Sequence, residues 1–453
     1  MPRRPTPNPS LQNGGYTPCI PVGPNGAGEF TGRYLVLLRA GATRNAVQSL
    51  RDVAGLDDVA STADYADGLD LAEVSDTPVI VFDRLGVAVV SADPAQVDAL
   101  TAAMDEDSPL LAIEPERIMH TFATGPVAED ALEYLRGYRD AVVTLHNHLT
   151  GGDGLGLGGE VAETFLDDAV STWGLKATRT LSSRFSGRGV RVAILDTGID
   201  LGHPDFLGWI APAHARSFIA GESVQDGRGH GTHVTGIACG AERLGTGPRY
   251  GVAFRTDIFS GKVLSNAGRG PDCSILAGIE WALTNNCRVA SMSLGARVQP
   301  REAISVVYEN VARRCLAAGM LIVAAAGNDS DRRSDMIKPV ARPANCPSIM
   351  AVGALDNRLG VGFFSNGGIN PNGGGVDIAA PGVAVLSSLP LPARTGILTG
   401  TSIATPHVAG LAALWFEARG VTGGALWSAV TGSARRLALP SRDVGAGLAQ
   451  APQ

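Results

Sequence analysis

Asp196 and His230, which could act together as a general base, each lie in a short and distinctive segment of this chain. Asp196 closes an apolar run, VAILDTG at residues 192–198, where a buried carboxylate needs a hydrogen-bonding partner because an unpaired buried charge is costly. His230 opens a glycine-rich run, HGTHVTG at residues 230–236. Histidine is the side chain whose pKa suits proton transfer near neutral pH. A carboxylate and an imidazole are therefore available for acid–base chemistry.

A hydroxyl and an amide donor occur in two further segments. Ser402 lies in GTSIATPHVAG at residues 400–410, at the start of an expected helix, where backbone N–H groups and the helix dipole favour a developing negative charge. Asn328 follows a glycine at the end of VAAAGN, residues 323–328, and its amide could donate a hydrogen bond to an oxyanion. Each of the four side chains falls at the end of a strand or the start of a helix.

Each segment alone has a plainer interpretation. Asp-Thr-Gly also marks aspartic proteases, but those need two such carboxylates and the chain has this sequence once. His230 and His233 could be metal ligands or core residues, although zinc proteases of this kind use H-E-x-x-H, whose glutamate base is missing here. Ser402 could be only a helix N-cap, and Asn328 only a turn residue. The four segments together favour catalysis.

The elements expected around these residues alternate between strands and helices from Gly189 onwards. The expected strands are 190–195, 258–263, 289–294, 321–325, 348–352 and 376–379, and the expected helices are 233–239, 272–285 and 303–317. Such alternation predicts an α/β fold with a mostly parallel sheet and helices on both faces. Functional residues in that architecture gather at the carboxyl ends of the strands.

The chain before this region divides into three parts. Residues 1–29 are rich in Pro, Asn and Gly and are expected to be a flexible tail, and residues 30–122 form a small module. Residues 123–170 form a connector with an expected amphipathic helix at 129–148 and a glycine-rich linker at 151–159. The module's expected strands are 34–38, 79–82, 87–91 and 110–113, with helices at 43–54 and from Pro94. This order is the split βαβ, ferredoxin-like arrangement.

Composition excludes several classes of function. The 44 acidic and 37 basic residues give a net charge of -7, so there is no electrostatic case for nucleic-acid binding. No apolar run is long enough to predict a membrane span. The N-terminus lacks the apolar core of a signal peptide, which leaves a cytoplasmic location, export by another route, or a trimmed signal. The match of Gly154, Gly156 and Gly159 to a dinucleotide fingerprint follows no strand, which favours a linker.

The six cysteines show no close pairing of the C-x-x-C kind. Their spacing is compatible with buried thiols, and one or two disulfides stay open.

The order and surroundings of the four motifs resemble the subtilisin-like serine peptidases, from residues 172–175 (TWGL) to 444–448 (VGAGL). The resemblance implies a peptidase domain at residues 171–453 that acts as a serine endopeptidase through an acyl-enzyme. It implies that Ser402 is the nucleophile, that His230 accepts its proton, and that Asp196 orients His230. Asn328 and the Ser402 backbone N–H would stabilise the oxyanion.

The resemblance also implies how polypeptide substrates bind. A peptide would add as a β-strand between two edge segments, which gives affinity through backbone hydrogen bonds and tolerates many sequences. The implied substrate-binding residues are Ser293, Leu294, Gly295, Gly268, Arg269, Gly270, Ala326 and Gly327.

Residues 30–122 resemble the inhibitory propeptide of this family, including IEPERI at residues 113–118. The resemblance implies a zymogen whose own prodomain is an intramolecular inhibitor, with its C-terminal tail in the substrate groove. It places the cut between Phe122 and Ala123. A second cut in the glycine-rich linker, residues 151–159, would fit the usual preference of proteases for exposed glycine-rich chain.

Departures from the family concern metal binding and specificity. No cofactor is required, and the implied calcium ligand is Asp205, although residues 240–247 (GAERLGTG) lack the asparagine that the family has there. Ile403 follows the nucleophile where the family commonly has Met. Residues 329–342 are more charged than expected beside an apolar specificity pocket, and Phe122 at the implied cut indicates an aromatic preference.

Overall fold

The computed structural model describes residues 30–65, 71, 73–74, 76–122, 163–242 and 247–453. They fall into two compact units, Met1–Ile118 and Met119–Gln453, and the division lies within one strand. Four sequence predictions lie outside the described residues: the N-terminal tail at 1–29, the helix at 129–148, the linker at 151–159, and Ala123 at the implied cut.

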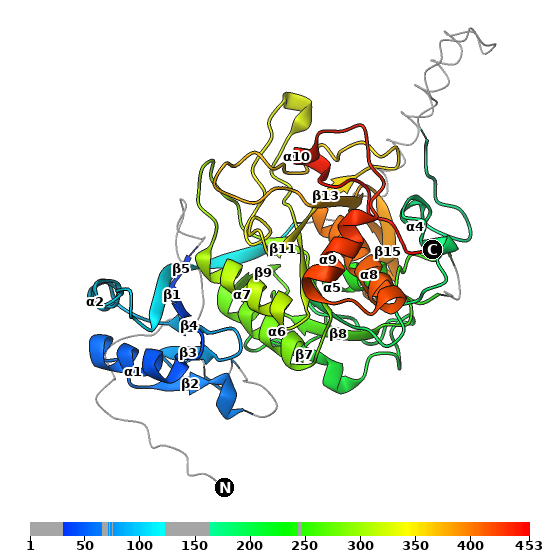
Figure 1. The fold of residues 1–453 in the computed structure, drawn as a ribbon. Coiled ribbons are helices and arrows are strands. Elements are labelled where there is room, and N and C mark those ends of the chain that lie inside the picture. Colours follow the sequence, from blue (N-terminus) through cyan, green and yellow to red (C-terminus); the bar gives the residue numbers. More distant parts are fainter. Residues whose placement is uncertain (1–29, 66–70, 72, 75, 123–162, 243–246) are drawn as a thin grey trace, which may run out of the picture. The chain divides into compact units, whose positions relative to one another are not determined.

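The first unit is an antiparallel sheet with two helices. Its elements are β1 (Phe30–Leu38), α1 (Thr43–Ala54), β2 (Val59–Ser61), β3 (Val79–Phe82), β4 (Val87–Val90), α2 (Pro94–Ala102) and β5 (Leu110–Thr121), drawn blue to cyan in Figure 1. The strand order is β5-β1-β4-β3, which is that of the split βαβ arrangement, with β2 added in parallel at the edge. Both helices end or begin as the sequence predicts: α1 stops at Gly55 in the left-handed conformation, and Asp93 and Gln96 form a capping box at α2.

The second unit contains the predicted parallel sheet. Its strands are β6 (Arg191–Asp196), β7 (Ala215–Ser217), β8 (Asp257–Lys262), β10 (Val289–Met292), β12 (Leu321–Ala325), β13 (Met350–Leu355) and β14 (Ile378–Pro381). The order is β14-β13-β12-β10-β6-β8-β7, and every neighbouring pair is parallel. Most of these strands are buried along almost their whole length, as expected for a sheet covered on both faces.

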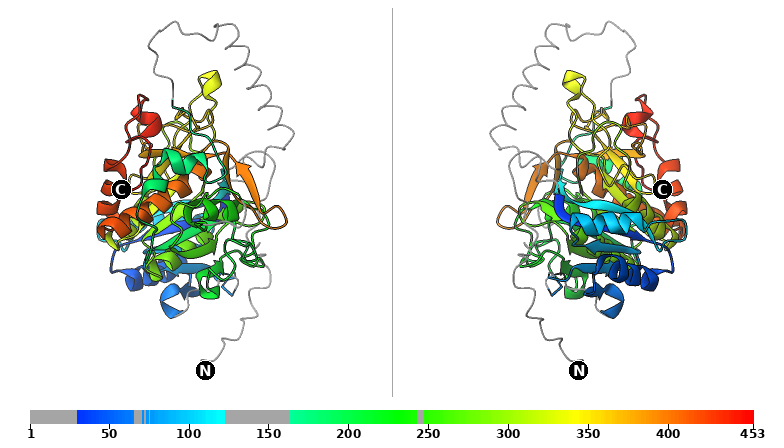
Figure 2. Two further views of the ribbon diagram at one scale, coloured as in Figure 1. Left: turned by 90° about the vertical axis from the view of Figure 1, so that its right-hand side faces the viewer. Right: turned by 90° about the vertical axis from the view of Figure 1, so that its left-hand side faces the viewer.

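Helices cover both faces of this sheet (Figures 1 and 2). The long helices are α5 (His230–Cys239), α6 (Asp272–Thr284), α7 (Val306–Ala317), α8 (Thr401–Arg419) and α9 (Gly423–Gly432). Ile194 of β6 shares a core with Val234 of α5 and Val408 of α8, whereas Leu195 faces Gly278 of α6. Because side chains alternate along a strand, Asp196 points to the same face as Ile194, toward α5 and α8.

Shorter elements complete this unit. They are α4 (Trp173–Ala177), α10 (Ser441–Val444), the edge strands β9 (Arg269–Pro271) and β11 (Leu294–Gly295), the hairpin β15 (Val385–Ser388) and β16 (Thr395–Leu398), and the 3-10 turns Thr180–Ser182, Pro212–His214 and Arg332–Ser334. One more 3-10 turn, Thr62–Asp64, belongs to the first unit.

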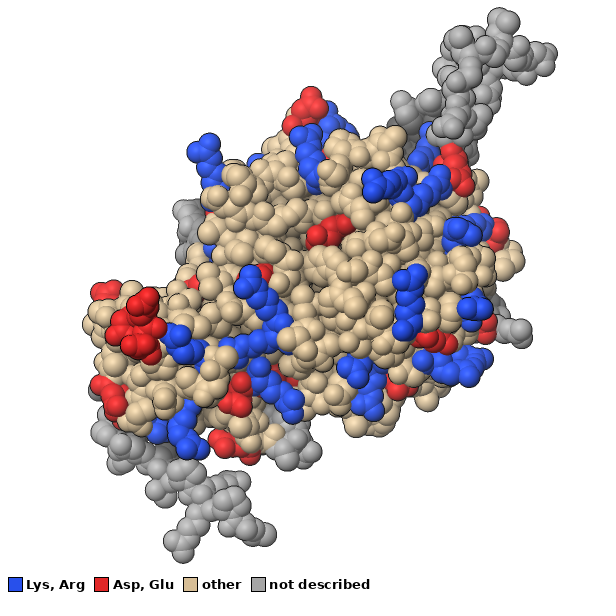
Figure 3. Space-filling view, viewed as in Figure 1, with Lys and Arg blue, Asp and Glu red and all other residues tan. Residues whose placement is uncertain are grey.

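Several expectations from the sequence can be compared with the described residues. Among these residues no disulfide joins the five cysteines, and burial raises the pKa of the Cys239, Cys287 and Cys315 thiols to about 12. No described helix is long and apolar enough to cross a membrane. Acidic and basic side chains are interspersed on the face shown in Figure 3.

The carboxylate of Asp377, just before β14, is expected to make the free energy of unfolding depend on pH. Burial raises the pKa of Asp377 from 3.8 to about 7, although a hydrogen bond from Ala351 N lowers it. The folded protein therefore keeps a proton at Asp377 between about pH 4 and pH 7 that the unfolded chain releases, and the free energy of unfolding falls as pH rises through this window.

We expect Asp377→Asn to remove much of this fall, by about 2–4 kcal/mol between pH 4 and pH 8. The measurement is denaturant unfolding at several pH values, made in a Ser402→Ala background to exclude self-digestion. Asp257→Asn, at an exposed position at the start of β8, is the matched control. Equal pH dependence in Asp377→Asn and the control would contradict the prediction.

Candidate active site

Asp196 and His230 meet at the carboxyl edge of the parallel sheet. Asp196 is the last residue of β6 and His230 the first of α5, and His230 Nδ1 lies 2.7 Å from Asp196 Oδ1. Both side chains are almost fully buried, with 1% and 3% exposed. Thr197 N donates to the same carboxylate oxygen at 2.7 Å. The imidazole is therefore oriented through Nδ1, while its Nε2 has no hydrogen-bond partner among the described residues.

A close backbone approach brings α5 to this position. Gly198 follows β6 with a φ of 102°, and a Cβ at Gly231 would overlap the Gly198 carbonyl. Only glycines at both positions allow the turn after β6 to touch the first turn of α5. This contact explains why the Asp-Thr-Gly and His-Gly-Thr sequences occur together.

Asp226 supports the start of α5 and is a residue that the sequence analysis missed. Its Oδ2 accepts from Thr232 N and Oγ1, both at 2.8 Å, and its Oδ1 accepts from Gly229 N and Thr197 Oγ1 at 2.8 and 2.9 Å. Thr197 Oγ1 in turn accepts from Gly231 N at 2.8 Å. A carboxylate at a helix N-terminus is stabilised by the helix dipole and its N–H groups. An acidic residue shortly before the HGTH sequence was the signal that could have identified it.

Ser402, Asn328 and Phe122 converge on one point. A Cβ placed on Gly400 would lie 2.8 Å from Ser402 Oγ, from Asn328 Nδ2 and from Phe122 O. Asn328 Nδ2 donates to the Phe122 carbonyl oxygen. Ser402 is the second residue of α8 and is fully buried, and its Oγ has no hydrogen-bond partner among the described residues. A hydroxyl, an amide donor and a peptide carbonyl thus share one small space.

The side-chain oxygen of Asn328 is held by two hydrogen bonds from Thr401. Its Oδ1 accepts from Thr401 N at 2.9 Å and from Thr401 Oγ1 at 2.8 Å, while Thr401 Oγ1 accepts from Gly327 N at 3.0 Å. Because Oδ1 is used in this way, Nδ2 is directed toward the Phe122 carbonyl.

The segment Met119–Phe122 lies as an added strand between two edges of the second unit. Thr121 and His120 pair antiparallel with Leu294 and Gly295 of β11, and Thr121 N donates to Gly268 O at 3.1 Å. β9 also pairs with β5. The Phe122 ring packs on Gly295, where a Cβ would lie 2.6 Å from Cε2. A peptide backbone is therefore accommodated in this groove, with a large side chain at its end.

The other residues expected to bind substrate have different surroundings. Ser293 Oγ donates to the Ser402 carbonyl at 2.6 Å, so it supports the start of α8. Ala326 is fully buried, and a Cβ on Gly327 would overlap Asn366 Nδ2, so both residues are enclosed by the protein. Arg269 and Gly270 belong to β9: Arg269 is exposed, and a Cβ on Gly270 would overlap the Val263 carbonyl.

The charges near the groove are largely paired. Arg342 lies 3.4 Å from Asp272, which also accepts from Tyr308 at 2.8 Å, and all three are buried. Arg332 contacts Asp443 at 2.8 Å, and the exposed Arg297 contacts Asp329 at 2.5 Å. The unusual charge of residues 329–342 is therefore partly neutralised inside the fold.

His233 and His407 are fully buried. Burial lowers the pKa of His233 to about 3 and that of His407 to about 4, so both are neutral at ordinary pH. His233 Nε2 lies 3.1 Å from Gly396 O. Among the described residues no group of three or more His, Cys, Asp or Glu side chains could hold a metal ion.

Asp205, the implied calcium ligand, is engaged by a protein donor. Its carboxylate accepts a hydrogen bond from the hydroxyl of the buried Tyr250 and lies 3.8 Å from His203 Nδ1. Residues 243–246 of the expected partner loop lie outside the described residues. A calcium site needs six to eight oxygen ligands, so calcium binding at Asp205 stays a prediction.

Comparisons with known proteins show which family this chain is similar to. Residues 187–443 match the subtilase family. The chain is 38% identical over 243 residues to the subtilisin of Bacillus pumilus and to subtilisin E of Bacillus subtilis strain 168, and 40% identical over 247 residues to subtilisin BL of Lederbergia lenta. Each match covers 53% of this chain, and covers 81%, 58% and 82% of those relatives, respectively.

Asp205 and Tyr250 generate a prediction about metal removal. We expect EDTA to leave the melting temperature unchanged, because the Asp205 carboxylate has a protein donor. Tyr250→Phe should instead lower the free energy of unfolding by about 1.5–3 kcal/mol, the value of a hydrogen bond to a charged group. Tyr65→Phe, at an exposed site, is the control, and both tests use calorimetry in the Ser402→Ala background. A fall in melting temperature with EDTA that calcium reverses would contradict the expectation.

Proposed function

Because this chain belongs to the subtilase family and is a serine endopeptidase, we propose that Asp196, His230 and Ser402 are its catalytic triad. The observation that carries the proposal is the 2.7 Å contact between His230 Nδ1 and Asp196 Oδ1, at the sheet edge where the first turn of α8 carries Ser402. Among the described residues, His230 Nε2 and Ser402 Oγ have no hydrogen-bond partner, and these are the two atoms that the proposed proton transfer uses.

In the proposed mechanism Asp196 selects the tautomer of His230. Asp196 Oδ1 accepts a hydrogen bond from Nδ1–H, so Nε2 carries the lone pair and accepts the hydroxyl proton as Ser402 Oγ bonds to the substrate carbonyl carbon. The C–N bond then breaks, and Nε2 returns the proton to the leaving amine. Water attacks the acyl-enzyme by the same route and releases the acid.

The proposed oxyanion site consists of Asn328 Nδ2 and the backbone N–H of Ser402. The contact of Asn328 Nδ2 with the Phe122 carbonyl supports this role, because the amide already meets a peptide carbonyl beside Ser402 Oγ. Hydrogen bonds fixed in advance stabilise charge that develops during the reaction without reorganisation.

The proposed substrates are extended polypeptide segments with a large side chain before the cut bond. Met119–Phe122 supplies the pattern: its backbone pairs with Leu294, Gly295 and Gly268, and Phe122 packs on Gly295. Backbone pairing of this kind tolerates many sequences. The same contacts support the proposal that residues 30–122 inhibit the enzyme and that it cuts itself between Phe122 and Ala123.

Self-processing tests the nucleophile and the cut together. We expect the intact mass of the purified wild-type chain to fall as the bond after Phe122 is cut, while Ser402→Ala stays full length. A fluorophosphonate probe should label the wild type and not the variant. Cutting of both proteins at this bond, or labelling of both, would contradict the assignment of Ser402.

Asn328→Leu tests the oxyanion donor. We expect kcat to fall about 10²–10³-fold with little change in KM, because the lost hydrogen bond acts mainly in the transition state. The control is Asn310→Leu on the outer face of α7, where the amide bonds only within its helix. A rise in KM at constant kcat would indicate that Asn328 binds the ground state instead.

A further inference from the structure

Lys262 is a fully buried cation beside the active site that the proposed mechanism does not use. It ends β8, next to Asp196 at the end of β6. Its Nζ donates to Thr197 O at 2.6 Å and to Asn266 Oδ1 at 2.8 Å, and lies 3.2 Å from Glu222 Oε2. An ammonium has three N–H donors, and three partners surround this one. Such complete pairing is needed because a buried charge without partners is strongly destabilising.

One partner belongs to the catalytic strand end. Thr197 directly follows Asp196, its N–H donates to Asp196 Oδ1, and its Oγ1 donates to Asp226, which holds the start of α5. The hydrogen bond from Lys262 to the Thr197 carbonyl therefore restrains Thr197, the residue that makes these contacts.

A second partner belongs to the turn that pairs with the bound strand. Asn266 lies two residues before Gly268, whose carbonyl accepts from Thr121 N. Ser265 N donates to Arg269 O and Gly268 N to Ser265 O, both at 2.8 Å, so the turn is closed on itself. The position of the 265–269 turn therefore depends on the hydrogen bonds of the Asn266 side chain.

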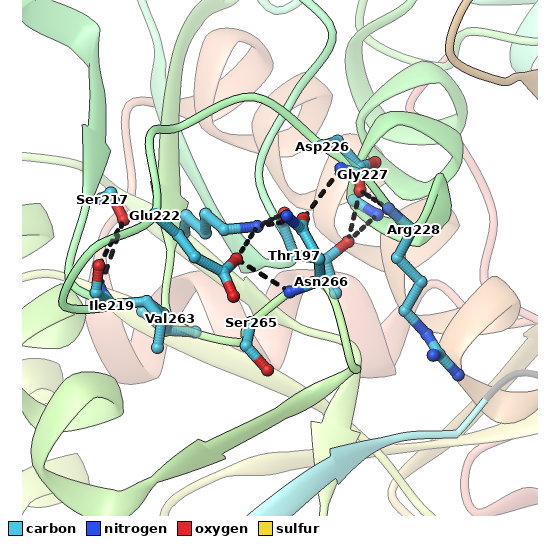
Figure 4. Close-up of polar contacts among 12 residues, drawn as sticks. Thr197, Ser217, Ile219, Glu222, Asp226, Gly227, Arg228, Val263, Ser265 and Asn266 are labelled. Atoms are coloured by element: carbon cyan, nitrogen blue, oxygen red, sulfur yellow. Dashed lines mark hydrogen bonds and ion pairs between the residues drawn. The ribbon is translucent and has the colours of Figure 1, made fainter. Parts of the chain in front are cut away.

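Asn266 and Glu222 extend the network to the loop before His230. Asn266 Oδ1 also accepts from Gly227 N at 2.8 Å, and Asn266 N donates to Glu222 Oε2 at 2.9 Å (Figure 4). Glu222 has 27% of its side chain exposed, whereas Lys262 has none. The lysine is therefore the enclosed centre of the network, and the glutamate balances its charge from the solvent side.

We propose that Lys262 is a positioning residue that fixes the 265–269 turn, and with it the Gly268 carbonyl, relative to the Asp196–His230 pair. The ammonium acts through Thr197 and Asn266 and does not touch the substrate. This inference rests on the proposed role of Gly268 in pairing with substrate. Its consequence is that the gain from lengthening a substrate upstream of the cut bond depends on Lys262.

The test compares two substrates on self-processed enzyme. One is an N-acetyl-phenylalanine amide, which does not reach Gly268, and the other is a tetrapeptide amide ending in Phe, which does. The readout is the ratio of kcat/KM for the long substrate to that for the short one, because a merely structural change would lower both together. The variants are Lys262→Met and Asn266→Ala. Lys176→Met is the control, since Lys176 lies on α4 and forms an exposed ion pair with Asp168.

We expect the ratio to fall about tenfold in both variants, as for the loss of one well-placed hydrogen bond, and to stay at the wild-type value in the control. A wild-type ratio in folded Lys262→Met overturns the proposal. If Lys262→Met does not fold, Asn266→Ala decides in the same way. If the wild type itself gains nothing from the longer substrate, the assignment of Gly268 fails first, and hydrolysis of the short substrate shows that the triad is unaffected.

Discussion

The buried carboxylate of Asp196 is the constraint on which the rest of the site depends. With 1% of its side chain exposed, it has almost no water to stabilise its charge, so the protein must supply donors. Thr197 N and His230 Nδ1 bond the same oxygen. To bring these donors there, the chain turns sharply at Gly198 and lays the first turn of α5 directly on that turn. The glycines, threonines and Asp226 around it follow from this requirement.

The parallel sheet makes such convergence possible. β6, β8, β10 and β12 run in the same direction, so Asp196, Lys262 and the segments that lead to Ser293 and Asn328 reach one edge. Helix α8 begins at that edge, with Ser402 in its first turn, and Ser293 donates to the Ser402 carbonyl. The site is therefore assembled by strand ends and helix starts that are far apart in sequence and are joined through a few short hydrogen bonds.

Sequence reasoning was most successful where the signal is local. The parallel sheet follows from apolar runs, and α1 and β12 have the predicted bounds because Gly55 and Gly327 mark their ends. β5 was predicted to end at residue 113 and continues to Thr121, because its polar residues pair with neighbouring strands instead of showing apolar alternation. β2 was missed because a strand of three residues leaves almost no periodic pattern.

The partners of buried charges could not be predicted in this way. Lys262, Asp226 and the pair of Asp272 with Arg342 depend on residues brought together only by the fold. In the sequence each is one charged residue among many, without a distinguishing neighbour. The motif order indicated which side chains could do chemistry, but it did not indicate which side chains hold them in place.

The segment Met119–Phe122 has a consequence for how activity would appear over time. If residues 30–122 inhibit the enzyme as proposed, this segment of the uncut chain would compete with substrate for the groove as part of the same molecule, at an effective concentration that for short flexible linkers is in the millimolar range. A cut after Phe122 would leave the groove contacts unchanged, but residues 119–122 would then belong to a separate molecule. The fraction of grooves that this separate molecule occupies would depend on the total protein concentration. A dilute sample would therefore become active sooner than a concentrated one, even though every chain was cut at the same rate.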